Sequence, residues 1–449
     1  MPLKSIPRRL GWPKVCLALT AAASISWTVR ASGASPAPMV QAAVSARELL
    51  AHPEALAARV RLGNPVIGAA SARVDQSRAQ IGISGLRPNP VLTFSVGGMA
   101  VGTRNPEWLP WPNTPNVTLG ISQTLEIAKR GARMQASRLG AASESASLAA
   151  VEAEQIALSR EQLARITWLA ARAKLLADRL ANARNVVELE RVRLERGEIS
   201  GVDHDRLVLD AAAAERDVSD NAVVQATAHS DCAVLLGAKC EDDASMDDAE
   251  QWARVPEVPA ERLIAERPDL RALRLAAQAA EQEAVVWERR KIPDPTIGLS
   301  YTRDYLTYAG NQPNTLMLWA AVPVPTFDRG QHQAAQARAR AAELRAELTA
   351  AERRAVEDVR ELQARTQVLD SKLSTLTSVA LPRAEAALRG GEEAYRRGQI
   401  SLTDLLLLRR ELPALLLAEQ DTRFELMMIR NKLRLVLGLD APGRAGATP

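Results

Sequence analysis

The second half of this chain repeats the first half at an offset of about 200 residues. Four landmarks recur in the same order with only small drift in spacing. They are a Pro-x-Pro element at 88–90 and 293–295, an Arg-Gly pair at 130–131 and 329–330, the motif RGEIS at 196–200 and RGQIS at 397–401, and a Leu-Gly pair at 236–237 and 437–438. Such an order indicates a duplicated module rather than two unrelated domains.

The composition favours closely packed helices. Aromatic residues make up only 3% of the chain and hydrophobic residues 47%, so Ala and Leu must supply most of the packing. The net charge is +4, and the basic residues alternate with acidic ones along the expected helices. We interpret the charges as solvated helix faces, and we expect no nucleic-acid partner.

The N-terminus has the features of an export signal. Four basic residues precede an apolar stretch at 15–29, and small residues follow at 31–34. This stretch is short for a transmembrane helix. Cys16 lacks the small-residue context of a lipid-attachment cysteine, and no other apolar run is long enough to span a bilayer as a helix. We therefore predict an exported chain with a signal peptide at 1–34 and no helical anchor.

Two cysteines, Cys232 and Cys240, remain after cleavage of such a signal. An oxidising compartment favours a disulfide that closes a small loop at the end of a helix, while two unpaired thiols fit the sequence equally well. The C-x₇-C spacing is not a zinc motif, and no cluster of His or Cys accompanies it. We predict no metal site and no cofactor.

Each module contains helices followed by a pair of strands. We expect an N-terminal helix at 45–62, a helix at 65–86 and its counterpart at 268–291. The Pro-x-Pro elements end the last two, because proline lacks an amide donor and disfavours the helical conformation in the residue before it.

Four runs with a period of two residues follow these elements. Their apolar positions are Leu92, Phe94 and Val96; Val117, Leu119 and Ile121; Ile297, Leu299 and Tyr301; and Leu316, Leu318 and Ala320. Polar or small residues alternate with them, except that Met317 and Trp319 occupy the second face of the last run. A half-buried hairpin of a soluble domain explains the alternation, and so does a membrane barrel with lipid outside and a wet lumen.

The connections at 99–115 and 304–313 carry aromatic residues that suit a membrane interface, namely Trp108, Trp111, Tyr305 and Tyr308. Four strands cannot close around a pore, and open sheet edges do not survive in hydrocarbon. The membrane interpretation therefore requires an oligomer.

Long helices dominate each module. Residues 130–196 and 329–397 are nearly all helix formers, and 69 helical residues would extend roughly 100 Å. Each helix ends at a glycine, Gly197 or Gly398, and a second helix returns to Leu236 or Leu437. The sequence thus predicts two antiparallel helical hairpins, the second of them kinked at Pro382 and Pro413.

This layout resembles the TolC-type outer-membrane efflux family over essentially the whole mature chain. Residues 395–406 (YRRGQISLTDLL) are similar to the tip motif of that family. Residues 322–331 (VPVPTFDRGQ) and 381–385 (LPRAE) are similar to its cobalt–zinc–cadmium efflux branch.

The resemblance implies a mainly α fold with a small β part. Each chain would contribute four strands to a trimeric twelve-stranded outer-membrane barrel on a long periplasmic helical tunnel. It also implies three kinds of contact besides the homotrimer: outer-membrane lipid, a periplasmic adaptor, and an inner-membrane pump of the resistance–nodulation–division type. The chain would be a passive exit duct and not an enzyme.

On this basis we divide the chain into six parts. They are a signal peptide (1–34), an N-terminal periplasmic segment (35–64), a first repeat (65–240), a linker (241–266), a second repeat (267–440) and a C-terminal tail (441–449).

The tips of the hairpins are the candidate functional sites. Glycine ends a helix readily because it tolerates the left-handed turn, which explains Gly197 and Gly398 without any function. By resemblance the tips, including Ser401, face the adaptor. Asp404 matches one acidic gate position of the family, and Asp203 is its counterpart in the first repeat. An ordinary helix cap explains both acids equally well, and the two roles are compatible.

The tips depart from the gate pattern of the family at one position, and they carry one histidine. Arg206 and Leu407 occupy the next gate position of the family, so its full acidic pattern is absent. His204 lies between acids and is interpreted as exposed surface.

Three functions remain open from the sequence. The first is an efflux duct for heavy-metal cations. The second is the same duct serving a drug pump or type I secretion. The third belongs to another class, a periplasmic coiled-coil scaffold that never enters a membrane.

Overall fold

The computed structural model describes residues 41–99, 102, 105–252, 255, 260–306 and 312–441. All of them belong to one compact unit, Gln41–Pro449. The expected signal peptide at 1–34 with Cys16, the expected interface residue Tyr308, and residues 442–449 of the expected tail lie outside the described residues.

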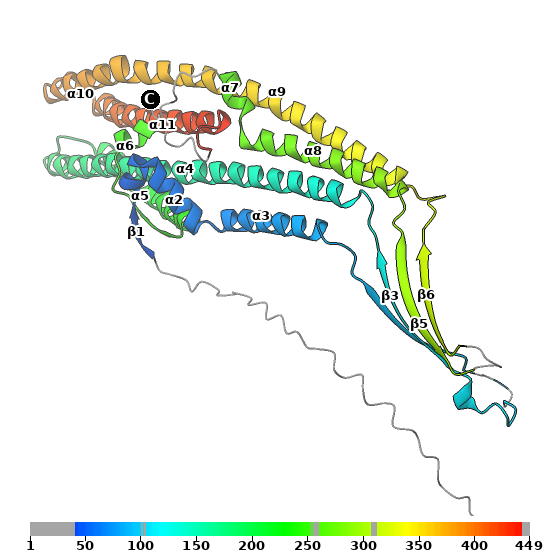
Figure 1. Ribbon diagram of the computed structural model, residues 1–449. Coiled ribbons are helices and arrows are strands. Elements are labelled where there is room, and N and C mark those ends of the chain that lie inside the picture. Colours follow the sequence, from blue (N-terminus) through cyan, green and yellow to red (C-terminus); the bar gives the residue numbers. More distant parts are fainter. Residues whose placement is uncertain are drawn as a thin grey trace, which may run out of the picture. The chain divides into compact units, whose positions relative to one another are not determined.

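The duplicated module is visible in the order of the elements (Figure 1). The first repeat contains α3 (Pro65–Ser84), β2 (Val91–Gly97), the 3₁₀ turn η1 (Trp111–Asn113), β3 (Asn116–Thr124), α4 (Arg130–Glu195) and α5 (Gly201–Leu236). The second contains α8 (Pro268–Glu288), the 3₁₀ turn η2 (Arg289–Lys291), β5 (Thr296–Asp304), β6 (Asn314–Ala321), α9 (Gln331–Thr375), the π-helical segment η3 (Leu376–Ala380), α10 (Leu381–Arg396) and α11 (Leu402–Val436).

Six shorter elements lie outside these series. They are β1 (Gln41–Ser45), α1 (Ala46–Ala51), α2 (Pro53–Gly63), β4 (Ala238–Glu241), α6 (Met246–Trp252) and α7 (Ala260–Ala265). The parallel pairing of β1 with β4 was not predicted, because runs of five and four residues carry too little alternation to be recognised. The expected linker at 241–266 contains α6 and α7.

The expectation of one N-terminal helix at 45–62 is wrong. His52 separates α1 from α2 with φ −121° and ψ 88°. Pro53 follows directly, and a proline disfavours the helical conformation in its predecessor. The chain therefore stops one helix at Ala51 and begins the next at the proline, which occupies a favourable first position.

The long second-repeat helix is also interrupted. The π-helical segment η3 separates α9 from α10, and Pro382 lies in the first turn of α10. Proline removes an amide donor and clashes with the carbonyl of the preceding turn, which the wider π geometry accommodates. Pro413, by contrast, lies within the continuous helix α11.

Helix α4 is the centre of the packing. It contacts α3, α5, α8 and α11, and in Figure 1 it runs between α3 and α8. Its residues Leu163, Ile166 and Leu169 are almost fully buried. They join a cluster with Leu56 of α2 and Leu236 of α5.

Alanine lines much of the contact between α8 and α9, as in Ala277, Ala280 and Ala341. Small side chains allow helices to approach closely, as the composition predicts. Within the described residues, no helix combines the length and the apolar character needed to cross a membrane.

The four predicted strands form one antiparallel sheet in the order β2-β3-β5-β6. Its central pair, β3 with β5, joins the two repeats. The register aligns the apolar positions in rows across all four strands. One row is Leu92, Ile121, Leu299 and Leu318, and the next is Phe94, Leu119, Tyr301 and Leu316.

Candidate functional site

The two tip turns have the same backbone geometry. Gly197 and Gly398 have φ values of 73° and 71°, which lie in the left-handed region. Glu198 N–H donates to Arg193 O at 2.9 Å, and Gln399 N–H donates to Ala394 O at 2.8 Å. These bonds close the helix ends in the pattern typical of a glycine terminus.

Ser200 and Ser401 cap the returning helices, and the tip acids Asp203 and Asp404 bond to these serines from the first turn. Ser401 Oγ accepts from Asp404 N–H at 3.2 Å, and Ser401 N–H donates to the Asp404 carboxylate at 3.2 Å. Ser200 Oγ likewise accepts from Asp203 N–H at 3.1 Å and donates to its carboxylate at 2.8 Å. Asp404 thus completes a capping box with Ser401, whereas the Asp203 carboxylate bonds to the Ser200 hydroxyl. The gate role of both acids stays a prediction.

Polar contacts tie the two hairpins together near the tips. Arg410 of α11 forms an ion pair with Asp210 of α5 at 2.8 Å. Arg206 pairs with Asp203 at 3.4 Å and donates to Thr403 Oγ1 at 3.3 Å. The contacts from Arg410 to Asp210 and from Arg206 to Thr403 connect the first repeat to the second, so one hairpin cannot move away from the other without breaking them.

A third tie involves an aromatic ring. Arg193 Nη1 donates to Tyr395 OH at 2.8 Å, and its guanidinium lies 5.4 Å from the ring centroid. Burial and the nearby Glu190 raise the pKa of Tyr395 above its ordinary value, although Arg193 opposes the shift. The hydrogen bond to Glu198 raises the pKa of Arg193, although burial acts in the opposite direction. The contact therefore joins a neutral phenol to a charged guanidinium.

The sequence analysis did not identify these ties. From the sequence, Arg206 is only a departure from the family pattern and Tyr395 only the first residue of the tip motif. No role is assigned there to Arg193, Asp210 or Arg410. The sequence does not show which residue of the second repeat will pair with a charged residue on a helix of the first repeat. Only the proximity of each residue to a tip motif could have marked it.

The hairpins leave space between them behind the tips. A groove of about 430 Å³ is lined by leucines of α4, α5, α10 and α11, and Asp210 and Arg410 line it as well. A neighbouring groove of about 460 Å³ includes Arg193 and Tyr395. The ties thus cross a loosely packed interface rather than a filled core.

The strand residues present one apolar face to the outside of the chain. Leu92, Leu316 and Leu318 are 71%, 70% and 74% exposed. Phe94, Leu119, Ile297 and Leu299 are exposed as well, and Val117 is half-buried. So large an apolar surface requires a cover in the functional protein.

The opposite face of the sheet is small or hydroxylated on β2, β3 and β5, whereas β6 places Met317 and Trp319 there. Thr118 Oγ1 bonds to Thr302 Oγ1 at 2.8 Å, and Thr124 Oγ1 to Thr296 Oγ1 at 3.0 Å. Trp319 lies against Gly298, where a Cβ atom would be 2.2 Å from the indole. The connecting segments place Trp108, Trp111 and Tyr305 at the surface.

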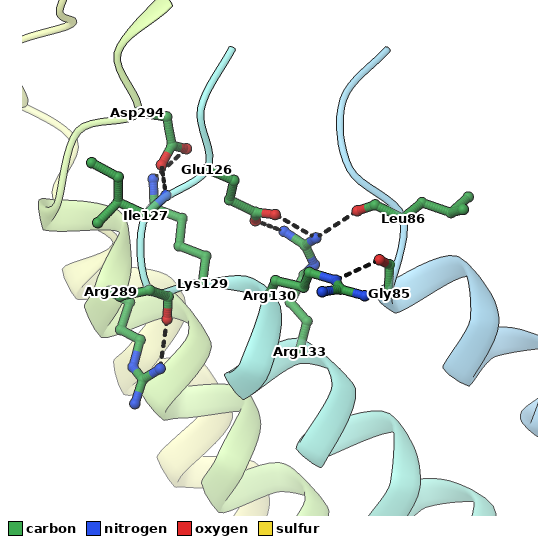
Figure 2. A network of polar contacts seen from close by, with 10 residues as sticks. Gly85, Leu86, Glu126, Ile127, Lys129, Arg130, Arg133, Arg289 and Asp294 are labelled. Carbon is green, nitrogen blue, oxygen red and sulfur yellow. Dashed lines mark hydrogen bonds and ion pairs between the residues drawn. The ribbon is translucent and has the colours of Figure 1, made fainter. Parts of the chain in front are cut away.

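A network of polar contacts joins the strands to the helices (Figure 2). Asp294 accepts from Lys129 Nζ at 2.6 Å and from Ile127 N–H at 3.0 Å. Arg289 donates to Ala128 O at 2.5 Å. The contacts hold the chain entering α4 against the chain leaving α8. Asp294 is the central residue of the second Pro-x-Pro element, which is the only sequence signal for this network.

Cys232 and Cys240 form a disulfide with an S–S distance of 1.98 Å. It links α5 to β4, beyond the end of the helix. In the part of the chain that the structure describes, no three His, Cys, Asp or Glu residues are grouped to hold a metal ion. His204 Nε2 at the tip is buried there without a hydrogen-bond partner.

Known structures share this fold. The CusC structure, described for folding and transmembrane channel formation, matches with a TM-score of 0.73 and 17% identity over 86% of this chain and 92% of that chain. VceC of Vibrio cholerae, an outer membrane protein, matches with a TM-score of 0.69 and 20% identity over 86% and 96%. The open state of the MtrE outer membrane channel of Neisseria gonorrhoeae matches with a TM-score of 0.71 and 16% identity over 89% and 91%.

No match was found among curated proteins. The structural matches confirm the expected fold class, mainly helical with a small sheet and built twice. The family model for outer membrane efflux proteins matches residues 56–238 and 260–439, which is most of the chain and includes both repeats. The chain therefore belongs to the outer membrane efflux protein family and is an efflux channel protein of the outer membrane.

Proposed function

We propose that three copies of this chain form the exit duct of a tripartite efflux system that exports heavy-metal cations. Each copy would contribute β2, β3, β5 and β6 to a twelve-stranded barrel, and its helical hairpins to a periplasmic tunnel. A periplasmic adaptor and an inner-membrane pump of the resistance–nodulation–division type would be the partners. The duct itself is passive, and the pump supplies the energy.

The exposed apolar face of the sheet carries this proposal. The rows of Leu92 and Phe94 cross all four strands, so the face is continuous, and lipid is the cover that suits it. Strands β2 and β6 each have one edge without a partner in the described sheet. Joining β6 of one copy to β2 of the next satisfies both edges and closes the sheet.

The tips support a gated duct. Around a threefold axis, Asp203 and Asp404 would repeat as rings of carboxylates, which attract cations and repel anions. The ties from Arg410 to Asp210 and from Arg206 to Thr403 would hold the hairpins in the closed arrangement. An adaptor that docks at the tips would open the duct by separating them.

The cation cargo rests on two supports. One is the sequence similarity of residues 322–331 and 381–385 to the cobalt–zinc–cadmium branch. The other is the acidic character of Asp203 and Asp404 at the tips. Selectivity for one cation would belong to the pump and the adaptor, because a duct that bound its cargo tightly would release it slowly.

A susceptibility panel tests the cargo. A deletion strain and its complemented parent are compared on zinc, cobalt, cadmium, nickel, copper and silver, and on several drugs and bile salts. We expect sensitivity confined to metals. Sensitivity confined to drugs or detergents would reject the metal cargo and support a drug-efflux duct.

A fractionation experiment tests the duct itself. We expect heat-modifiable trimers that need detergent and are found in the outer-membrane fraction. A soluble monomer in the periplasm would contradict the duct and favour the coiled-coil scaffold.

A further inference from the structure

Basic residues gather where the helices meet the strands. Four segments meet there, at 85–87, 126–133, 288–294 and 328–330, and contacts such as Arg130 to Gly85 O at 2.6 Å and Arg290 to Asp328 at 3.1 Å connect them. Figure 2 shows much of this region. Its eight cations, which we name the junction belt, are Arg87, Lys129, Arg130, Arg133, Arg289, Arg290, Lys291 and Arg329. The same segments hold four acids, Glu126, Glu288, Asp294 and Asp328.

Only three of the eight cations pair with those acids. They are Lys129 with Asp294, Arg133 with Glu126 and Arg290 with Asp328. The acid Glu288 pairs instead with Arg338 of α9. The junction belt therefore keeps a surplus of positive charge.

The other five cations have no acid within ion-pair distance in the described part of the chain. Arg130, Arg289 and Arg329 donate to backbone carbonyl oxygens of Gly85, Ala128 and Pro325. A carbonyl accepts a hydrogen bond without neutralising the guanidinium. Arg87 and Lys291 are exposed.

The apolar face of the sheet runs into the junction belt. Leu125 and Ile127 continue the alternation of Ile121 past the end of β3, and they are 43% and 45% exposed. Val322 and Val324 do the same after β6, at 55% and 77%, and Phe327 is 92% exposed. Exposed apolar residues thus reach the sequence positions of the cations.

The apolar strands, the junction belt and the helices follow one another in that order, and this order sets the depth of the junction belt in the membrane. The strands carry the lipid-facing rows, and the periplasmic helices begin beyond the belt. Cations directly next to a lipid-facing apolar surface stand at the level of the headgroups. The leaflet in question is the one on the side of the helices, which is the periplasmic leaflet.

A groove lies at the level of the junction belt. It has a volume of about 750 Å³ and lies between α4 and α8. Small residues such as Ala136, Gly140 and Ala280 line it, together with the three paired cations Lys129, Arg133 and Arg290. Four acids, Glu126, Glu144, Glu283 and Asp294, line it as well, so the surplus of positive charge lies outside this groove.

We propose that the junction belt binds the phosphate groups of anionic phospholipids in the periplasmic leaflet. Guanidinium groups form charge-assisted hydrogen bonds with phosphate, and the unpaired cations supply the electrostatic attraction. The neighbouring Val322, Val324 and Phe327 contact the acyl chains. A free phosphate ion would use the cations alone and would leave these apolar residues exposed.

The test uses the purified full-length protein in a neutral detergent. Dioctanoyl-phosphatidylglycerol, dioctanoyl-phosphatidylcholine and inorganic phosphate are titrated separately, and binding is read from the shift in the thermal unfolding midpoint. The test variant is Arg87→Gln/Lys291→Gln/Arg329→Gln. The matched control, Lys372→Gln/Arg383→Gln/Arg389→Gln, neutralises three exposed cations on α9 and α10 that also lack an ion pair in the described structure.

We expect the anionic lipid to bind the unchanged protein and the control equally. The test variant should bind it more weakly, by about two orders of magnitude for three cations. Added salt should weaken binding to the unchanged protein. Arg87→Gln/Lys291→Gln, which removes no hydrogen bond seen in the structure, should show an intermediate loss.

Three results would overturn the proposal: equal binding of the two lipids, equal loss in the control variant, or inorganic phosphate that binds as tightly as the anionic lipid. None of them depends on the cargo, because the susceptibility panel involves no added lipid. A failure of the lipid site and a failure of the metal cargo can therefore be told apart.

Discussion

Arg160 of α4 forms a two-point ion pair with Asp440, which lies just after α11, with both N···O distances at 3.0 Å. The two residues are only 3% and 4% exposed. Arg160 also donates to Asn431 at 3.2 Å and lies 5.1 Å from the ring of Trp252. The first repeat is thus joined to the end of the second through a buried charge pair.

Removing one partner of this pair should be costly. We expect Asp440→Ala to destabilise the protein by about 3–5 kcal/mol, because Arg160 would remain charged and buried without its partner. Urea unfolding of the purified protein, followed by tryptophan fluorescence, measures the loss. The double variant Arg160→Met/Asp440→Leu should restore part of it, because Arg434, which lies 3.5 Å from Asp440, also loses that contact. A double variant as unstable as the single one would contradict this account.

The cap and gate roles of the tip acids can be separated by substitution. Asp203→Asn/Asp404→Asn keeps an oxygen that can accept the capping hydrogen bond and removes the charge. We expect it to lower the preference for cations over anions in planar-bilayer recordings with little change in stability. Ser200→Ala/Ser401→Ala should cost about 1 kcal/mol per cap and leave the preference intact. Unchanged selectivity in the asparagine variant would remove the gate role.

Gly330 should not tolerate a side chain. Its φ is 77°, and a Cβ atom would lie 2.1 Å from the carbonyl oxygen of Trp287. We expect Gly330→Ala to destabilise the folded protein by at least about 1–3 kcal/mol and to reduce its yield in the outer membrane. Gly68→Ala is the control, since nothing lies within 4 Å and the glycine is helical. It should stabilise by up to about 1 kcal/mol.

The disulfide should stabilise the region around β4. It closes a short loop between α5 and the strand that pairs with β1. We expect Cys232→Ala/Cys240→Ala to lose roughly 2–3 kcal/mol. A reducing agent should lower the thermal midpoint of the unchanged protein toward that of the variant. The prediction would be contradicted if the reductant left the thermal midpoint unchanged in a protein that thiol labelling shows to be fully reduced.

Acid should weaken the anchor of the N-terminal helix. Burial acts to raise the pKa of Asp243, but hydrogen bonds from Ser45 Oγ and from the backbone N–H of Arg47 outweigh it, so the pKa falls below 3.8. The folded state thus binds this proton less readily than the unfolded state. Its stabilisation is complete above pH 3.8 and is lost as the pH falls through the folded pKa.

The measurement compares thermal midpoints of the unchanged protein and Asp243→Asn across the acid range. We expect a difference at neutral pH that shrinks once the pH falls below 3.8. A difference that stays constant down to the lowest pH would show that the carboxylate charge does not contribute.

The long periodic elements could be predicted and the tertiary contacts could not. Sixty or so consecutive helix formers leave few alternatives, so α4 was expected at 130–196 and is found at Arg130–Glu195. The alternation in β2, β3, β5 and β6 likewise determines which residues of each strand lie on the same face. Such signals depend only on neighbouring residues, and because the module is duplicated, each of them occurs in both repeats.

The rest depended on partners distant in sequence. Arg160 looked like any solvated charge, and nothing near it indicates Asp440, 280 positions away. The break at His52 has Pro53 as its sequence signal, although the same proline also suits the first turn of a new helix. At the tips, the motif located the turns and the caps, whereas Arg410 and Tyr395 gained meaning only from the hairpin that lies opposite.

The register of the sheet restricts how such a chain can change. Successive side chains of a strand point to opposite faces, so the apolar residues share one face only while the register is kept. Insertion or deletion of one residue within β3 would move the apolar side chains beyond that point to the other face, out of line with β2 and β5. Copying an entire hairpin with its flanking helices preserves parity automatically. Insertions and deletions should consequently be tolerated in the connections around Trp111 and beyond Tyr305, and should disrupt the sheet when they fall within the paired strands.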